Sequence, residues 1–307
     1  MKKGQEKISL DSTLKSMDTE EFIDLHFYRP IGYRWALLFD RLNISPNAVT
    51  IASIIIGIAA GICFYYTSLT INLIGMLLLI WANSYDSADG QLARMTGKTS
   101  QLGRTLDGLS GISWFIAIYA AICFRLFPSW GFWIWALAAF TGFFHGKQTE
   151  LADYYRNIHL HFLKGKKFSE LTDSATLKET GATLSWKRNF IQKFSVYYYT
   201  MYTKDQETWT PRFQQMMSLL REKFPLETPS RFREEFRAKS LPLMKFTNIC
   251  SFNTRVIALF VALLINQPWL YFIFELIVLN FILIYMIIRH ERICKYFVNR
   301  LSTEQYD

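Results

Sequence analysis

Long apolar runs alternate with short polar or proline-containing breaks along most of this chain. A helix needs about 20 mainly apolar residues to cross a hydrocarbon core about 30 Å thick, and six stretches come close to this length. They fall into three pairs, and only a few residues join the members of each pair. The pattern therefore predicts six transmembrane helices in three hairpins: Val49–Thr67, Ile71–Ala88, Leu106–Leu126, Trp130–His145, Ile249–Asn266 and Trp269–Ile288.

In the residues ahead of the first run, apolar side chains recur at helical spacing and do not form a continuous apolar stretch. From Glu21 to Leu42, apolar side chains recur near helical spacing with Asp, Arg and His between them, which predicts an amphipathic helix lying in the membrane interface. Pro30 and Gly32 are expected to kink or divide this helix. Ser45-Pro46-Asn47 then predicts a turn and a cap into the first span.

The apolar pattern stops between Arg156 and Lys245. This segment contains 17 Lys and Arg and nine Asp and Glu, a net charge of +8 out of +9 for the whole chain. Its part from Trp186 to Tyr199 mixes cations with aromatic rings. Two interpretations are open: a segment lying on an anionic membrane surface, or a small helical subdomain with a solvated basic face.

Composition supports a lipid environment. The chain is 51% hydrophobic and only 19% charged, whereas soluble domains are about 25% charged; disordered, collagen-like and coiled-coil classes are excluded. Lys and Arg are absent from the connections at 68–70 and 266–268. The positive-inside bias therefore places the more basic connections and both termini in the cytoplasm, namely 1–44, 95–104, 156–245 and 289–307.

These features predict an all-α integral membrane protein with six transmembrane helices, an N-terminal amphipathic interfacial helix and a helical cytoplasmic insertion. The expected parts are the cytoplasmic N-terminus with the amphipathic helix (1–44), transmembrane helices one to four (45–155), the basic insertion (156–245), helices five and six (246–300) and a C-terminal tail (301–307).

Three aspartates lie near the ends of the second and third spans, where ionisable groups usually mark function. Asp86 and Asp89 are three residues apart and share a helix face, and the hairpin brings Asp107 back to their level. Carboxylates crowded in a partly dry site need compensation, and Mg²⁺ or Mn²⁺ is the usual ion where carboxylates are the only ligands. The alternative is simple pairing with Arg94 and Arg104 at a helix end.

The motif Asp86-x2-Asp89-Gly90-x2-Ala93-Arg94-x8-Gly103-x3-Asp107 resembles the signature of the CDP-alcohol phosphotransferase family, D-x2-D-G-x2-A-R-x8-G-x3-D-x3-D. The resemblance extends to the six spans and the preceding amphipathic helix, but not to 156–245. Members typically displace CMP from a CDP-alcohol, with two divalent metals held by the aspartates. The resemblance implies metal binding by Asp86, Asp89 and Asp107 and nucleotide or phosphate binding by Gly90, Ala93, Arg94 and Gly103.

The last carboxylate of the signature is missing, because position 111 is glycine. In the family, this carboxylate is the base for the attacking hydroxyl and a ligand of the second metal. Another group has taken over, or the donor and acceptor differ, or the site is degenerate or inactivated. His145, in the fourth span at about the expected depth of the aspartates, is our candidate catalytic residue, with structural hydrogen bonding as the alternative.

Arg255, in the fifth span, is expected at a similar depth. A buried arginine needs an anion, and either a substrate phosphate or an aspartate would serve; we expect the phosphate, which makes Arg255 a substrate-binding residue. Glu275 is expected near the opposite membrane face with a structural role.

Together, the residues and the resemblance predict a metal-dependent membrane phosphotransferase that makes a phospholipid or sphingophospholipid. The commonest family reaction is phosphatidyl-alcohol synthesis from CDP-diacylglycerol, whereas Gly111 favours another branch, such as a bacterial inositol-phosphoceramide synthase type. A degenerate lipid-binding homologue and a cation transporter are the other classes considered. The resemblance implies a lipid substrate, a CDP-linked donor, a homodimer and an active site on the cytoplasmic side of a bacterial inner membrane; nucleic acid is not an expected partner.

Overall fold

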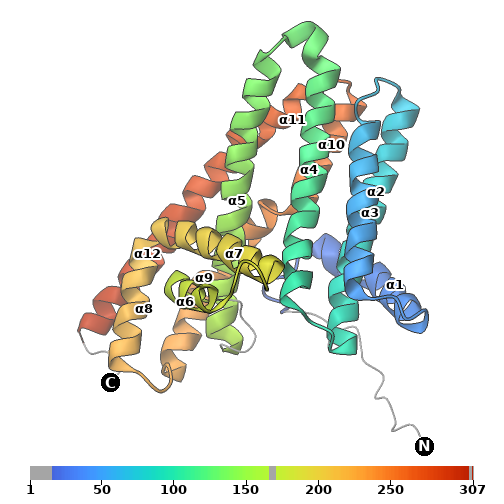
Figure 1. Cartoon of the computed structure of the whole chain (residues 1–307). Helices are drawn as coiled ribbons and strands as arrows, with labels where there is room; N and C mark the ends of the chain where they lie inside the picture. The colour runs from blue at the N-terminus through green and yellow to red at the C-terminus, as the bar shows by residue number, and fades with distance from the viewer. Residues whose placement is uncertain (1–15, 166–170, 304–305, 307) are drawn as a thin grey trace, which may run out of the picture. The chain divides into compact units, whose positions relative to one another are not determined.

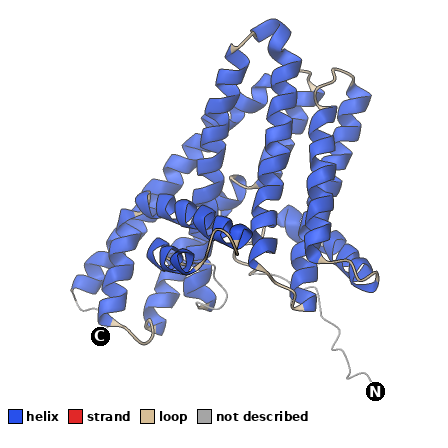
Figure 2. Cartoon of the chain, in the orientation of Figure 1, coloured by secondary structure: helices blue, strands red, loops and turns tan. Residues whose placement is uncertain are grey.

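The computed structural model of this chain describes residues 16–165, 171–303 and 306. They form helices joined by turns, with no strand among them (Figure 1 and Figure 2), which confirms the predicted all-α fold. In chain order the helices are η2 (Asp24–Tyr28), α1 (Arg29–Arg41), α2 (Pro46–Cys63), α3 (Leu69–Thr96), α4 (Gln101–Trp130), α5 (Trp133–Lys164), α6 (Ser174–Thr183), α7 (Phe190–Thr208), α8 (Pro211–Lys223), α9 (Ser230–Ile249), α10 (Phe252–Leu264), α11 (Trp269–Phe274), η4 (Glu275–Leu279) and α12 (Asn280–Ser302), where η denotes a π-helical turn.

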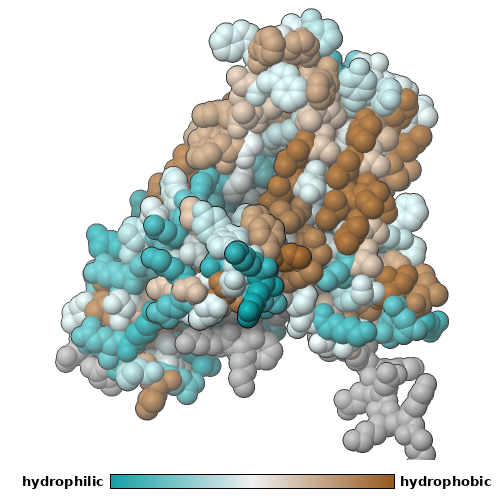
Figure 3. Space-filling model, in the orientation of Figure 1, coloured by the Kyte–Doolittle hydropathy of each residue, from teal (hydrophilic) through white to brown (hydrophobic). Residues whose placement is uncertain are grey.

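Within the described residues, five helical segments are long and apolar enough to cross a membrane: Pro46–Cys63, Leu69–Thr96, Leu102–Trp130, Ser230–Leu264 and Trp269–Ser302. Hydrophobic side chains cover α2 to α4 on the face shown in Figure 3. The fourth predicted span lies in α5, whose apolar run ends at Phe144 and is followed by Lys147, Gln148 and Glu150. The number of six spans therefore stays a prediction.

The chain divides into two compact units, which are described separately. Unit 1 consists of Met1–Gly142 and Val256–Ile273, and unit 2 consists of Phe143–Arg255 and Phe274–Asp307. The aspartate motif belongs to unit 1. The predicted basic insertion, 156–245, lies in unit 2.

Small residues on α2 let α4 approach it closely in unit 1. Ser53, Gly57 and Gly61 repeat every four residues, and a Cβ built on Gly57 would lie only 2.1 Å from Cδ1 of Trp114. The Trp114 indole N–H donates to the Ser53 carbonyl at 3.1 Å. Small residues at this spacing are a common device for close packing of membrane helices. The contact holds the part of α4 that carries Asp107 against α2.

The helix ahead of the first span packs against α3. The chain is helical without a break through η2 and α1, so Pro30 and Gly32 do not divide this helix, and a kink there stays a prediction. A π-helical turn ends two residues before Pro30, where the helix changes its hydrogen-bonding register around a residue that has no N–H to donate. Gly32 provides space for α3, because a Cβ there would lie 2.8 Å from the Ser87 hydroxyl oxygen. A location in the membrane interface stays a prediction.

The entry into α2 is as predicted, and the exit from α4 is not. Ser45 caps α2 by accepting the Ala48 N–H at 3.3 Å, with Pro46 in the first turn. The expected break at 127–129 is wrong, because α4 runs through Pro128 to Trp130 and the chain turns at Gly131, where φ is +55°. Pro128 lies in the last turn, so its missing N–H costs only one hydrogen bond before the helix ends.

Unit 2 is built around buried side chains of α5, α8, α9 and α12. Aromatic rings occupy its centre, with the Phe162 and Phe236 centroids 4.2 Å apart. Glu235 of α9 accepts hydrogen bonds from Arg300 and from the Tyr296 hydroxyl, each at 2.6 Å, which ties the end of α12 to α9.

Candidate metal centre and active site

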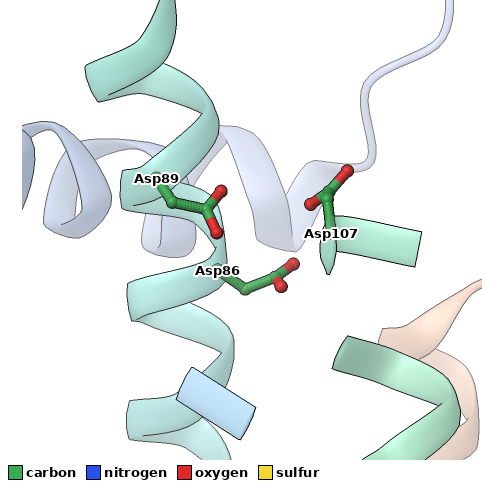
Figure 4. A group of neighbouring side chains, drawn as sticks. All are labelled: Asp86, Asp89 and Asp107. Atoms are coloured by element: carbon green, nitrogen blue, oxygen red, sulfur yellow. The ribbon is translucent and has the colours of Figure 1, made fainter. Parts of the chain in front are cut away.

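Three carboxylates from two helices of unit 1 converge, which confirms the geometry predicted from their spacing. Asp86 and Asp89 lie one turn apart on α3, and Asp107 lies on the first turns of α4; their side chains point toward a common space (Figure 4). One oxygen of each carboxylate lies within 4.8 Å of the others. Asp89 is only 4% exposed, whereas Asp107 is exposed. The group is therefore buried on the Asp89 side and accessible on the Asp107 side.

Two hydroxyl groups fix the orientation of these carboxylates. The Thr50 hydroxyl of α2 lies 2.5 Å from Asp89 Oδ2, and the Ser110 hydroxyl of α4 lies 2.6 Å from Asp86 Oδ1. Hydroxyls that donate to a carboxylate restrict its rotation and leave its remaining lone pairs available to a cation. Helices α2, α3 and α4 thus all contribute to the arrangement.

The donor set fits a hard divalent cation. Neither Asp86 nor Asp89 forms an ion pair with a lysine or arginine in the described part of the chain, so nearby protein cations do not neutralise them directly. Mg²⁺ binds oxygen ligands at about 2.0–2.1 Å in an octahedron, so ligands on opposite sides lie about 4 Å apart. The 4.8 Å limit on the carboxylate separations is close to this value, so Asp86, Asp89 and Asp107 would be able to hold such an ion.

The residues expected to bind nucleotide or phosphate lie on the same two helices. Gly90 and Arg94 are one turn apart on α3, and a Cβ on Gly90 would lie 3.4 Å from the Arg94 guanidinium. Ala93 is half-buried and Arg94 is exposed. Gly103 lies in the first turn of α4, where its N–H donates to the Ser100 hydroxyl at 2.9 Å. Arg94 of α3 therefore places an exposed cation beside Gly90, the residue that follows Asp89.

Comparison with known proteins agrees with this arrangement. Residues 43–148 match the family model described as CDP-alcohol phosphatidyltransferase. The matched part covers about a third of the chain. It contains all three aspartates and both hydroxyl residues that orient them. Enzymes of this family are phosphotransferases that depend on divalent metals.

A relative whose name describes a transferase also resembles part of this chain. The chain is 29% identical over 122 residues to the "Bifunctional IPC transferase and DIPP synthase" of Aquifex aeolicus (strain VF5), a match that covers 39% of this chain and 27% of the relative. The chain thus matches about a quarter of that protein's length. No solved structure matches the chain.

The matched part of the chain has glycine at position 111, where the signature quoted above ends in aspartate. This residue lies one turn beyond Asp107 on α4 and is half-buried. A Cβ built there meets no described atom within 4 Å. The space of the missing carboxylate is therefore open, and the backbone would tolerate an aspartate at this position.

A second polar cluster lies in unit 2 around His145 of α5, which falls near the end of the matched range. Its Nδ1 atom lies 3.0 Å from Glu275 Oε2 and 3.1 Å from Nη1 of Arg255. With Nδ1 protonated, the imidazole donates to Glu275; in the other tautomer, Nδ1 accepts from Arg255. The side chain of His145 is 15% exposed.

Glu275 also supplies an anion for Arg255. Their Oε2 and Nη1 atoms lie 3.0 Å apart, and both side chains are fully buried. Nη2 of Arg255 donates to Gln148 at 2.9 Å and to the Cys250 carbonyl at 3.2 Å, and the Gln148 amide donates to the Glu275 carbonyl at 3.1 Å. The partner seen in the structure is a glutamate of the same chain.

Glu275 lies beside His145 and Arg255, so the expectation that it lies at a different depth from these two residues is wrong. The phosphate contact expected for Arg255 stays a prediction.

Sequence reasoning missed the residues that orient the carboxylates. Thr50 lies one turn after Pro46 in an apolar run, and Ser110 lies one turn after Asp107. A lone hydroxyl in a span is usually satisfied by its own helix, and both residues are also within hydrogen-bond distance of carbonyls in their own helices. Their only sequence signal was that each lies about one turn from a proposed functional element.

Proposed function

We propose that the protein is a membrane lipid phosphotransferase that transfers a phospho-alcohol or phosphatidyl group to a hydroxyl acceptor. The observation that carries this proposal is the convergence of Asp86, Asp89 and Asp107 inside a domain that matches a family of phosphotransferases. In this proposal the three carboxylates hold Mg²⁺ or Mn²⁺. When bound, such an ion neutralises phosphate oxygens and stabilises the charge that develops during transfer.

The surrounding residues would position the donor. Arg94 is exposed next to Gly90, so its guanidinium is free to move and to form paired hydrogen bonds with a phosphate. Gly90, Ala93 and Gly103 have small side chains or none, which lets a diphosphate approach the backbone. Their position on the same helices as the aspartates supports binding of a CDP-linked donor.

We propose His145 as the base that accepts the proton of the attacking hydroxyl. Glu275 contacts Nδ1 of this imidazole, and a carboxylate on one ring nitrogen is the arrangement that sets the tautomer and leaves the other nitrogen to act as base. Glu275 would be a positioning residue in this role. The absence of a carboxylate at position 111 is the reason for seeking such a replacement.

Arg255 is open to two roles. Its bidentate geometry would suit a substrate phosphate, and we keep this as a prediction. The contact with Glu275 supports the alternative, in which Arg255 holds Glu275 and thereby His145. Arg255→Lys separates these roles, because a phosphate clamp should raise KM whereas a positioning role should lower kcat.

The identity of the acceptor determines which lipid is made. We propose that the product is a phospholipid or a sphingophospholipid such as inositol phosphoceramide. The relative's name identifies a transferase and a synthase in one chain and does not define this substrate. We further propose that the protein forms a homodimer in the bacterial inner membrane. The basic segments 95–104 and 156–245 support a site on the cytoplasmic side of that membrane.

A degenerate lipid-binding homologue is the second candidate, and Gly111 is the observation that favours it. The test is radiolabel transfer by the purified protein in lipid vesicles. CDP-diacylglycerol and phosphatidylinositol are supplied as donors, and inositol and ceramide as acceptors, with Mg²⁺, with Mn²⁺ or with EDTA. We expect one pair to give metal-dependent product that Asp89→Asn abolishes. No product from any pair, with substrate lipid still bound, would support the degenerate homologue.

A further inference from the structure

Helix α7 of unit 2 exposes a continuous row of large side chains. We define the aromatic face of α7 as Phe190, Ile191, Phe194, Tyr197, Tyr198 and Met201. Each of these side chains is between 36% and 62% exposed. Apolar side chains scattered singly on a surface are ordinary, but a contiguous patch of this kind marks an interaction surface.

The row follows the helical repeat. Phe190, Phe194, Tyr197 and Met201 are spaced by four, three and four residues, so they form one stripe along the helix. Ile191 and Tyr198 widen this stripe on one side. An apolar stripe of this width is what a helix normally buries against a core or in a membrane interface.

The opposite face of α7 is already held by unit 2, so the stripe cannot turn inward. Ser195 and Val196 are buried, and Gln206 donates to the Glu150 carbonyl of α5 at 3.2 Å. Glu207 accepts from the Ser174 N–H of α6 at 2.8 Å. These contacts fix the rotation of the helix and leave the aromatic face outward.

Charge around the stripe indicates what covers it. Residues 184–204 contain four cations, Lys187, Arg188, Lys193 and Lys204, and no Asp or Glu. The Lys193 ammonium lies 5.5 Å from the centre of the Trp186 ring, and Trp186 is itself exposed. Figure 3 shows hydrophobic and strongly hydrophilic side chains together over α7. Trp and Tyr favour the headgroup level of a bilayer, and basic residues next to them favour anionic lipids.

The direction of α7 also suits a membrane surface. In the view of Figure 1, α7 runs across α5 and α12 rather than along them. Helix α12 is part of the segment Trp269–Ser302, which is long and apolar enough to span a bilayer. A helix that crosses a membrane-spanning helix in this way suits a position along the membrane surface.

We propose that the aromatic face of α7 inserts into the headgroup region of an anionic membrane leaflet. Of the two interpretations of the segment 186–199, this proposal favours contact with the membrane. The helical subdomain then holds the aromatic face of α7 in place. The inference is independent of the catalytic proposal, because none of these residues belongs to the aspartate site or to the His145 cluster.

The test places a nitroxide on the full-length protein in vesicles. Phe194→Cys and Tyr197→Cys probe the aromatic face, and Glu222→Cys on α8 is the matched exposed control, all in a Cys63→Ser background because the other cysteines are buried. Collisions with oxygen, which partitions into lipid, are compared with collisions with a water-soluble nickel chelate. Vesicles contain phosphatidylcholine alone or mixed with phosphatidylglycerol.

We expect the nitroxides at 194 and 197 to collide mainly with oxygen and the nitroxide at 222 mainly with the nickel chelate. The contrast should grow in phosphatidylglycerol and shrink when Lys187, Arg188 and Lys193 are all replaced by Gln. Equal nickel access at 194, 197 and 222 would show a solvated face and overturn the proposal. Exclusion of both reagents at 194 and 197, with dipolar broadening between labels, would show that a second copy covers the face and would also overturn it.

Discussion

The protein contains two acidic sites, three aspartates in unit 1 and a single glutamate in unit 2, and their negative charges are balanced in different ways. In unit 1, Asp86 and Asp89 receive hydroxyl hydrogen bonds and form no ion pair within the described residues. In unit 2, Glu275 is paired with Arg255 and contacts His145. In unit 2 the paired cation comes from the same chain, whereas Asp86 and Asp89 have no such ion pair among the described residues. The comparison shows why the aspartates suit a bound metal ion and why Glu275 suits a positioning role.

The largest expected effect is the loss of a carboxylate from the unit 1 cluster. Asp89→Asn removes charge and a ligand, and loss of the several kcal/mol that a metal contributes to the transition state corresponds to about 10³-fold or more in rate. Radiolabel transfer in vesicles measures the change. Asp40→Asn, an exposed acidic residue of α1, is the control and should leave transfer unaltered. A similar loss in both variants would show that the effect is not specific to the cluster.

The next effect concerns the base. If His145 replaces the missing carboxylate, His145→Ala should lower kcat by about 10²–10⁴-fold, and Gly111→Asp should bring little gain. If the site is degenerate, the open space at Gly111 should allow Gly111→Asp to create activity. His145→Ala in the unaltered protein should then leave transfer activity unchanged. Both variants are measured in the same transfer assay. Recovery by Gly111→Asp from an inactive protein is the outcome that removes His145 from the reaction.

A smaller effect, on stability, tests whether Arg255 balances the buried charge of Glu275 in unit 2. Arg255→Met leaves Glu275 buried without its guanidinium and should lower the free energy of unfolding by about 3–5 kcal/mol. The double change Arg255→Met with Glu275→Met should recover much of this loss. Arg233→Met is the control, because its partner Glu227 is exposed and such pairs contribute about 0–1 kcal/mol. Thermal unfolding in detergent measures all four proteins, and a minor loss for Arg255→Met would indicate that Glu275 does not depend on it.

The smallest effect is expected from the hydroxyls. Thr50→Val and Ser110→Ala keep the carboxylates but release their orientation, which should weaken metal affinity by about 10–100-fold. Ser113→Ala is the control on α4, since the Ser113 hydroxyl bonds only to the Leu109 carbonyl among the contacts described here. Titration of the activity with Mg²⁺ gives the apparent affinity. Equal Mg²⁺ requirements in the three variants would show that the hydroxyls do not support the metal ligands.

The sequence was sufficient for features that depend on local spacing. Asp86 and Asp89 share a face because they are three residues apart, and the hairpin returns Asp107 to them. The cap at Ser45 was likewise readable from the Ser-Pro pair.

Features that depend on where helices end are harder to predict from the sequence. Pro128 resembles a break in the pattern, but a proline in the last turn of a helix is tolerated, and α4 continues to Trp130. The contacts of Glu275 with His145 and Arg255 join three separate helical segments, so spacing along the chain does not reveal them. The contacts of Thr50 and Arg255 join residues 39 and 107 or more positions apart in the chain, and no single-sequence pattern encodes such pairings.

Direct detection of Mn²⁺ is the sharpest test of the metal site. The full-length protein in vesicles is titrated with Mn²⁺, and the free ion is followed by its electron paramagnetic resonance signal. We expect saturable binding that Mg²⁺ competes away, that Asp86→Asn, Asp89→Asn and Asp107→Asn each abolish or strongly weaken, and that Glu275→Gln leaves intact. Mn²⁺ binding that survives all three aspartate changes, or that disappears only with Glu275→Gln, would contradict the assignment of the metal to unit 1.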